Sequence, residues 1–158
     1  MGCLFGGFLA KNPKNEVWLL DKDPARASFI RAHGIKIEGI SGPSSVRINA
    51  AHKPDEIGAC DLLILCVKSY DTDEAIKSAK GLISNDTLIL TLQNGIGNIE
   101  KIGKETGIEK VLGGVTSQGA TLLGVGNIRH AGRGDTVIGR ATGGGSEDLK
   151  LEAISHVL

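Results

Sequence analysis

Three short and almost uninterrupted aliphatic runs, at residues 61–67, 87–92 and 111–116, limit the folds open to this chain more than any other feature. A continuous apolar run of this length is typical of a strand buried on both faces of a parallel sheet. The segments between them, at 72–80 and 99–106, are predicted to be helices. Strands that alternate with helices predict an α/β fold with a doubly wound, mostly parallel sheet.

The first fifty residues continue this alternation. The patterns predict a helix over 1–11, a strand over 16–20, a helix over 24–32, and half-exposed strands over 35–40 and 46–50. The chain therefore begins with a helix where a doubly wound domain normally begins with a strand. The expected sheet lacks its first strand.

The pattern changes after residue 120. Short strands are expected over 120–125, 128–130 and 136–138, and a glycine loop over 143–145. A last helix is expected from Ser146, with that serine as its cap and Glu147 and Asp148 in its first turn. We therefore predict one dinucleotide-binding domain over 1–158, in which 120–140 is a strand-rich extension.

Composition excludes several classes of protein. The 18 basic and 18 acidic residues give a net charge of zero, so nucleic acid and anionic membrane are not expected as partners. No aliphatic run is long enough to span a bilayer, and no signal peptide is expected. Cys3, Cys60 and Cys66 form no CxxC pair, and the four histidines do not cluster, so we expect no metal and a cytoplasmic location.

The spacing of Gly2 and Asp21 suggests half of a dinucleotide-binding fingerprint. That fingerprint is a strand, G-x-G-x-x-G, a helix, and an acidic residue about 20 positions on. If Gly2 is the third glycine, Asp21 stands at the expected distance, and the first two glycines lie upstream of Met1. Asp21 would favour NAD, whereas Lys22 and Arg26 would suit the 2′-phosphate of NADP. The plainer interpretations are a small residue packed at a helix start and a solvated charged loop.

Polar or glycine-rich loops follow each of the three aliphatic strands. Lys68 follows the first, Asn94 with Gly95 the second, and 118–120 the third. Because ligands bind outside the carboxyl ends of such strands, these loops together predict a ligand crevice. An ordinary surface lysine and an Asn-Gly turn are the alternatives.

The strand-end segments VKSYDT and LQNGIGN, with GCLFGGFLAK, EVWLLDKDP and GGVTSQGATLLGVGNIRHAG, resemble the ketopantoate reductases (2-dehydropantoate 2-reductases) over nearly the whole chain. The resemblance implies a Rossmann-like domain and NADPH-dependent reduction of the keto acid ketopantoate to pantoate, in pantothenate and coenzyme A biosynthesis. It also implies a second, all-helical domain, which we do not expect within these 158 residues.

The resemblance also implies roles for individual residues. Gly2 corresponds to the last fingerprint glycine and Lys68 to the family's cofactor-side lysine. Asn94 corresponds to the asparagine that contacts cofactor and substrate, and Ala120 to a backbone contact near the nicotinamide. With Asp21 and Lys22 these form the expected cofactor site. The family's catalytic lysine belongs to the helical domain, so no catalytic residue is expected in this chain. The chain alone is then expected to be inactive, with the helical domain or a second copy as partner.

Two other functions stay open from the sequence. One is a non-catalytic nucleotide-binding or assembly domain. The other is the Rossmann domain of a different 2-keto-acid or hydroxy-acid reductase, against which the LQNGIGN and SQGATL segments argue.

Overall fold

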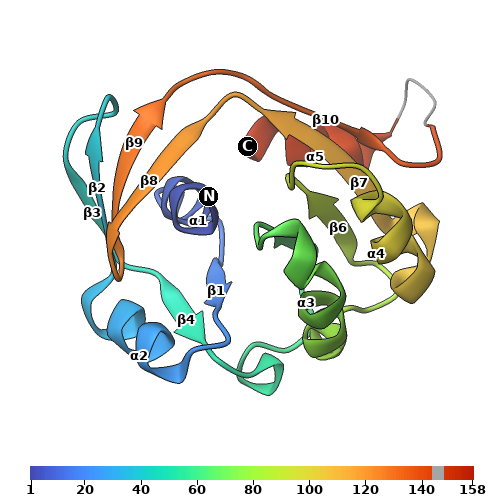
Figure 1. Cartoon of the computed structure of the whole chain (residues 1–158), viewed down its shortest axis with the longest axis horizontal. Coiled ribbons are helices and arrows are strands. Elements are labelled where there is room, and N and C mark those ends of the chain that lie inside the picture. Colours follow the sequence, from blue (N-terminus) through green and yellow to red (C-terminus); the bar gives the residue numbers. More distant parts are fainter. Residues whose placement is uncertain (144–147) are drawn as a thin grey trace. The chain divides into compact units, whose positions relative to one another are not determined.

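The computed structural model describes residues 1–143 and 148–158 (Figure 1). Its contacts divide the chain into two compact units. Unit 1 comprises Met1–Ile57 and Ser117–Asp135, and unit 2 comprises Gly58–Thr116 and Thr136–Leu158. No helix in the described part of the chain is long and apolar enough to cross a membrane. The expectation of a single domain over 1–158 stays a prediction.

Unit 1 contains two sheets and two helices. In the smaller sheet, β1 (Trp18–Leu20) pairs in parallel with β4 (Asn49–Ala51). The larger sheet has the order β3-β2-β9-β8, with β2 and β9 parallel. Its elements are β2 (Ile35–Gly39), β3 (Ser44–Val46), β8 (Gly119–Gly124) and β9 (Asn127–Gly132), and the helices of the unit are α1 (Gly2–Leu9) and α2 (Pro24–His33).

Glycines let α1 lie close to both sheets of unit 1. A Cβ atom at Gly6 would stand 2.9 Å from Leu19 Cδ2, and one at Gly7 would stand 2.9 Å from Ile37 Cδ1. A larger residue at either position would force the helix or the facing side chain to move. The apolar core beneath it is built of Leu4, Ile30, Ile35, Ile37, Ile48, Ala50 and Ile128.

Local signals explain where α2 begins and ends. Asp23 caps the helix, since its carboxylate accepts from the backbone N–H groups of Ala25 at 2.8 Å and Arg26 at 3.3 Å. Pro24 occupies the first turn. Gly34 ends the helix with a φ of +75°, and a Cβ there would stand against the carbonyl oxygen of Val46.

Unit 2 is built on one four-stranded sheet of order β10-β7-β6-β5. The strands β5, β6 and β7 are parallel, and β10 is antiparallel to β7. These strands span β5 (Leu62–Leu65), β6 (Leu88–Thr91), β7 (Val111–Thr116) and β10 (Thr136–Arg140), and the helices span α3 (Thr72–Ser78), α4 (Asn98–Thr106) and α5 (Leu149–Val157). The predicted alternation of strand and helix is confirmed here. Buried Leu65, Ile76, Ile89, Ile102 and Val111 form the core.

The single strand predicted over 46–50 is wrong. The segment is divided between β3, which pairs antiparallel with β2, and β4, which pairs with β1 in the other sheet. Val46, Ile48 and Ala50 are buried, while the residues between them are exposed. Because the alternation continues across the break, it cannot reveal that the chain changes sheets.

Two further expectations need correction. Of the three strands predicted to be buried, only β6 is buried along its whole length. In β5, an edge strand, Leu62, Leu63 and Ile64 are half-buried, and in β7 Val115 is 73% exposed. The last helix begins at Leu149 rather than at 146, with Asp148 as its cap. Ser146, with the rest of 144–147, lies outside the described residues.

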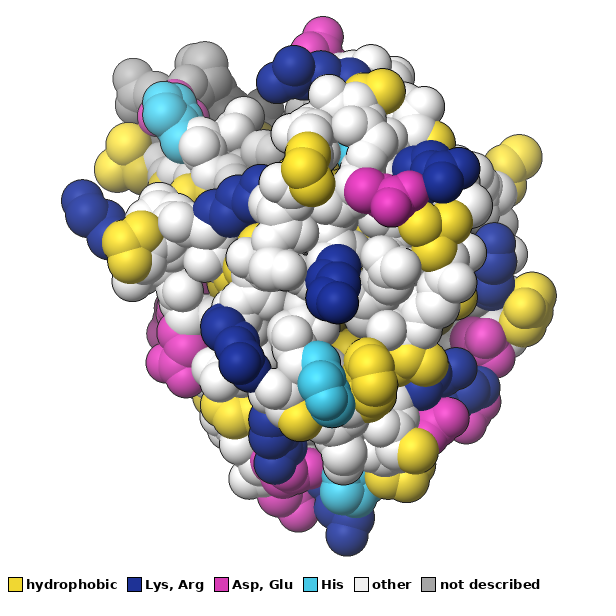
Figure 2. Space-filling model, turned by 90° about the vertical axis from the view of Figure 1, so that its left-hand side faces the viewer, with side chains coloured by type: hydrophobic (Ala, Val, Ile, Leu, Met, Phe, Trp, Pro, Cys, Tyr) yellow, Lys and Arg dark blue, Asp and Glu magenta, His cyan; other side chains and the backbone are white. Residues whose placement is uncertain are grey.

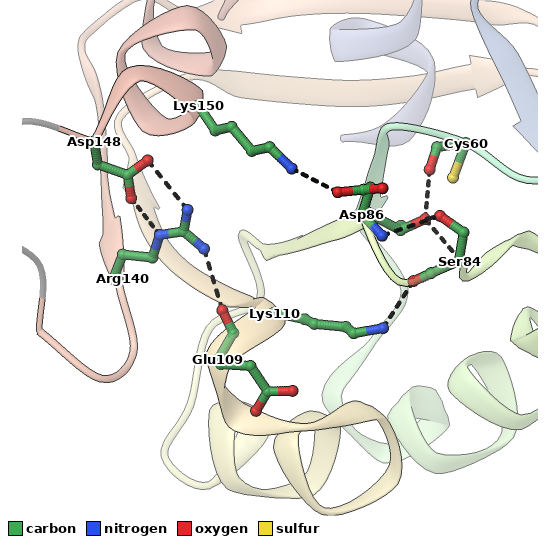
Figure 3. A network of polar contacts seen from close by, with 9 residues as sticks. Cys60, Ser84, Asp86, Glu109, Lys110, Arg140, Asp148 and Lys150 are labelled. Atoms are coloured by element: carbon green, nitrogen blue, oxygen red, sulfur yellow. Dashed lines mark hydrogen bonds and ion pairs between the residues drawn. The ribbon is translucent and has the colours of Figure 1, made fainter.

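Ion pairs join α5 to the rest of unit 2 (Figure 3). Arg140 on β10 donates from Nε to Asp148 Oδ2 at 2.5 Å and from Nη2 to Oδ1 at 3.1 Å. Its Nη1 also donates to the carbonyl oxygen of Glu109 at 3.1 Å. The guanidinium lowers the pKa of Asp148 to about 2. Lys150 on α5 pairs with Asp86 at 3.1 Å. These contacts hold α5 against the sheet.

Charges of both signs are interspersed on the face shown in Figure 2, and no broad area of one sign forms there. Several charged side chains of unit 1 are paired. Arg129 lies 2.8 Å from Glu38, and Arg31 lies 2.6 Å from Glu56. This arrangement agrees with the balanced composition.

Both units contain a parallel strand at an open sheet edge. Among the described residues β1 pairs only with β4, and β5 only with β6. The N–H of Leu88 donates to the Asp61 carbonyl, and that of Leu92 to the Leu65 carbonyl. Since backbone groups alternate in direction along a strand, those of Leu62 and Ile64 face the open edge. In a doubly wound sheet the first strand lies in the interior and pairs on both sides.

We therefore expect a polypeptide of residues 1–158 to associate with itself, or to be only marginally stable. Open apolar strands are templates for pairing with another chain, and unpaired backbone groups weaken the fold. Sedimentation and thermal melting over a hundredfold range of concentration would show either outcome. A monomer with a high melting temperature that does not change with concentration would contradict it.

Candidate functional site

The predicted ligand residues of unit 2 follow two neighbouring parallel strands. Leu65 at the end of β5 stands in register with Thr91 at the end of β6. Lys68 and Asn94 come three residues after these positions, and both are exposed. The structure thus brings the two loops to one edge of the sheet. This carboxyl edge is where ligands bind in parallel α/β sheets.

Exposed apolar side chains accompany the polar ones at this edge. Tyr70 is 80% exposed and Val67 is 39% exposed, on the loop that carries Lys68. Ile96, on the loop that carries Asn94, is fully exposed. Exposed apolar side chains beside polar ones can line a ligand-binding groove. An edge with both hydrogen-bonding and apolar groups suits a ligand that has a polar part and a flat ring.

A polar network beneath the two loops was not expected from the sequence. Gln93 donates from Nε2 to the carbonyl oxygen of Val67 at 2.8 Å and to Thr72 Oγ1 at 2.9 Å. Asn98 donates from Nδ2 to the carbonyl oxygen of Asn94 at 3.1 Å. The one signal available was a pair of amide residues directly after a buried strand. That pair predicted Asn94 as a ligand group but said nothing of what Gln93 touches.

The acidic end of β1, in unit 1, is occupied by an ion pair. Arg26 donates from Nη2 to Asp21 Oδ1 at 2.7 Å and from Nε to Oδ2 at 3.0 Å. The backbone N–H of Asp23 donates to the same carboxylate at 2.9 Å. The hydrogen bonds that Arg26 donates to Asp21 raise the pKa of the guanidinium. The negative charge expected to select between cofactors is thus largely balanced by its neighbour.

The other predicted residues also belong to unit 1. Gly2 begins α1, and exposed Lys22 follows Asp21 directly. Ala120 lies on β8 opposite His130 of β9. Lys68 and Asn94 therefore share an edge of unit 2, whereas Gly2, Asp21, Lys22 and Ala120 lie in unit 1.

His130 has a structural position in unit 1. It is 2% exposed, and its Nε2 lies 2.8 Å from Gln118 Oε1. Its ring packs edge-on against Phe8 of α1, with 5.3 Å between ring centroids. This contact joins α1 to β9.

The cysteines are free thiols. Burial raises the pKa of Cys3 and of Cys60, which lowers the fraction of reactive thiolate. Within residues 1–143 and 148–158, no group of three or more His, Cys, Asp or Glu side chains is arranged to hold a metal ion.

Parallel strands alternating with helices, with hydrogen-bonding side chains where two strands end, define an α/β domain of the Rossmann type. The family model described as ketopantoate reductase PanE/ApbA matches residues 1–143. The chain belongs to this family.

Individual relatives agree with this assignment. The chain is 41% identical over 140 residues to the 2-dehydropantoate 2-reductase of Pyrococcus abyssi, an alignment that covers 88% of this chain and 44% of the relative. The crystal structure of 2-dehydropantoate 2-reductase from Geobacter metallireducens superposes with a TM-score of 0.85 at 26% identity, covering 98% of this chain and 50% of that one. A complex of D-mandelate dehydrogenase with NADH superposes with a TM-score of 0.81 at 25% identity. The superposition covers 99% of this chain and 48% of that one. The chain thus spans about half the length of the relatives it matches.

Proposed function

We propose that this chain is the cofactor-binding domain of an NADPH-dependent reductase that converts 2-dehydropantoate to pantoate, a step of pantothenate and coenzyme A biosynthesis in the cytoplasm. The observation that carries the proposal is the placement of Lys68 and Asn94 on adjacent loops at one carboxyl edge. The names of the relatives support the choice of substrate.

The chemistry of the two side chains fits this role. The nicotinamide supplies the hydride when the cofactor is bound. Lys68 offers up to three hydrogen-bond donors for a ribose or a carbonyl oxygen, and Asn94 can donate and accept. Asn94 then serves both cofactor and substrate, and Ala120 is a backbone contact to the nicotinamide. Gly2 at the start of α1 and the residues Asp21 and Lys22 would serve the pyrophosphate and the adenosine ribose.

A chimera tests the proposal. Residues 1–158 would replace the matching part of the Pyrococcus abyssi relative, whose own flanking segments complete the protein. We expect the chimera to reduce 2-dehydropantoate with NADPH. A chimera that melts cooperatively yet neither binds NADPH nor reduces the substrate would contradict the proposal.

Cofactor choice yields a separate prediction. The pairing of Arg26 with Asp21 removes much of the repulsion that a lone carboxylate exerts on a 2′-phosphate, so we propose NADP over NAD. The NADH complex of D-mandelate dehydrogenase makes NAD the competing cofactor. In the chimera, Asp21→Asn should strengthen NADPH binding relative to NADH about tenfold, and Arg26→Ala should shift the ratio the other way. Wild-type binding of NADH at least tenfold tighter than NADPH would show that the carboxylate dominates.

A further inference from the structure

Three polar side chains of unit 2, Gln93, Thr72 and Asn98, form a connected set that we call the edge network. Thr72 is fully buried and Asn98 is 4% exposed. Thr72 Oγ1 accepts from Gln93 Nε2 at 2.9 Å. It also lies 3.3 Å from Asn98 Oδ1, a contact without a hydrogen bond when the one hydroxyl proton goes to the Ser69 carbonyl oxygen at 2.9 Å. A buried polar network with its groups satisfied orders whatever it contacts.

The edge network holds the backbone on both sides of Lys68. Gln93 Nε2 donates to the carbonyl oxygen of Val67 at 2.8 Å, directly before the lysine. Thr72 Oγ1 donates to the carbonyl oxygen of Ser69 at 2.9 Å, directly after it. Since a carbonyl oxygen only accepts, the orientation of the Gln93 amide is determined by this contact.

The same network holds the backbone at Asn94. Asn98 Nδ2 donates to the carbonyl oxygens of Asn94 at 3.1 Å and Gly95 at 3.3 Å. Gly95 has a φ of +104°, a backbone conformation that glycine adopts easily because it has no Cβ. The hydrogen bonds from Asn98 order the loop at this glycine. Gln93 therefore ties the loop after β6 to the loop after β5, and Asn98 ties the loop after β6 to the start of α4.

We propose that Gln93 and Thr72 are positioning residues, which fix the backbone on both sides of Lys68, and that Asn98 does the same at Asn94, before a ligand arrives. The inference rests on the proposed function in so far as Lys68 and Asn94 are the ligand groups. Binding to groups that are already ordered avoids the entropy loss of ordering them.

The Thr72 hydroxyl provides a sharp test. Thr72→Val keeps the shape of the side chain but removes the hydroxyl, which leaves the Ser69 carbonyl and one Gln93 N–H without their partner. Thr72→Ser keeps the hydroxyl and removes only a methyl group. Ile76→Val, on the same helix and 1% exposed, is a control for general loss of stability.

Hydrogen exchange on residues 1–158 is the first measurement. With Thr72→Val, exchange over 67–72 and 93–98 should rise about tenfold more than exchange over 88–92 in β6. Thr72→Ser should match the wild type, and Ile76→Val should raise exchange in all three segments alike. The proposal would be overturned if Thr72→Val raised exchange equally in all three segments, or did not raise it at all. It would also be overturned if Thr72→Ser changed exchange as much as Thr72→Val.

NADPH affinity of the chimera is the second measurement. Thr72→Val should weaken binding about tenfold, with Thr72→Ser within threefold of wild type. Equal affinity of the valine variant and the wild type would overturn the proposal. If the wild-type chimera binds no NADPH, the proposed function fails, and the hydrogen-exchange result decides on the edge network by itself.

Discussion

Residues 1–158 expressed alone are expected to reduce 2-dehydropantoate at least a hundredfold more slowly than the chimera with the Pyrococcus abyssi relative. Reduction of the keto group needs a proton donor and a group that anchors the substrate carboxylate. Lys68 and Asn94 suit the cofactor side of that reaction, and the family resemblance assigns the catalytic lysine to the helical domain. Loss of a positioned general acid alone costs about 10²–10⁴-fold in rate.

The measurement is steady-state loss of NADPH absorbance at saturating substrate. A mixture of residues 1–158 with the separately expressed remainder of the relative serves as a control for reassembly. Turnover by the 158 residues alone within tenfold of the chimera would show that they carry their own proton donor.

Alanine at Lys68 or at Asn94 of the chimera should weaken cofactor or substrate use by about 1–3 kcal/mol, or about 5- to 150-fold in kcat/KM. Both side chains are exposed at the carboxyl edge, so each substitution removes a ligand contact and little packing. The melting temperature should therefore stay nearly unchanged.

Lys104→Ala provides a matched control, because Lys104 is an exposed lysine in the last turn of α4. Its kinetics should equal those of the wild type. Wild-type kinetics in both the Lys68 and the Asn94 variants would refute the site assignment. A large loss of stability in either variant would favour a structural role for that residue.

The continuous aliphatic runs predicted the parallel strands of unit 2, because burial of both sides of a strand leaves a direct mark on composition. The same reasoning overestimated the burial of β5, since sequence does not show which strand lies at an edge. It also joined β3 to β4, where alternating burial continues from Val46 to Ala50 although the hydrogen-bond partners change.

The candidate site was predictable where residues follow strands directly. Lys68 and Asn94 could be placed at one edge because parallel strands end on the same side. The edge network could not be predicted from the sequence, since Thr72 and Gln93 are 21 residues apart and meet only in the folded chain. The charges of Asp21 and Arg26 could be read from the sequence. Their bidentate ion pair could not, because it depends on the turn between β1 and α2.

The most direct test of the account is a map of NADPH binding to the chimera by hydrogen exchange, with and without saturating cofactor. Protection at the segments 67–71 and 93–98, lost in the Lys68→Ala and Asn94→Ala variants, is the predicted result. Saturable binding that leaves both segments unprotected would contradict the claim that this edge of the sheet holds the cofactor.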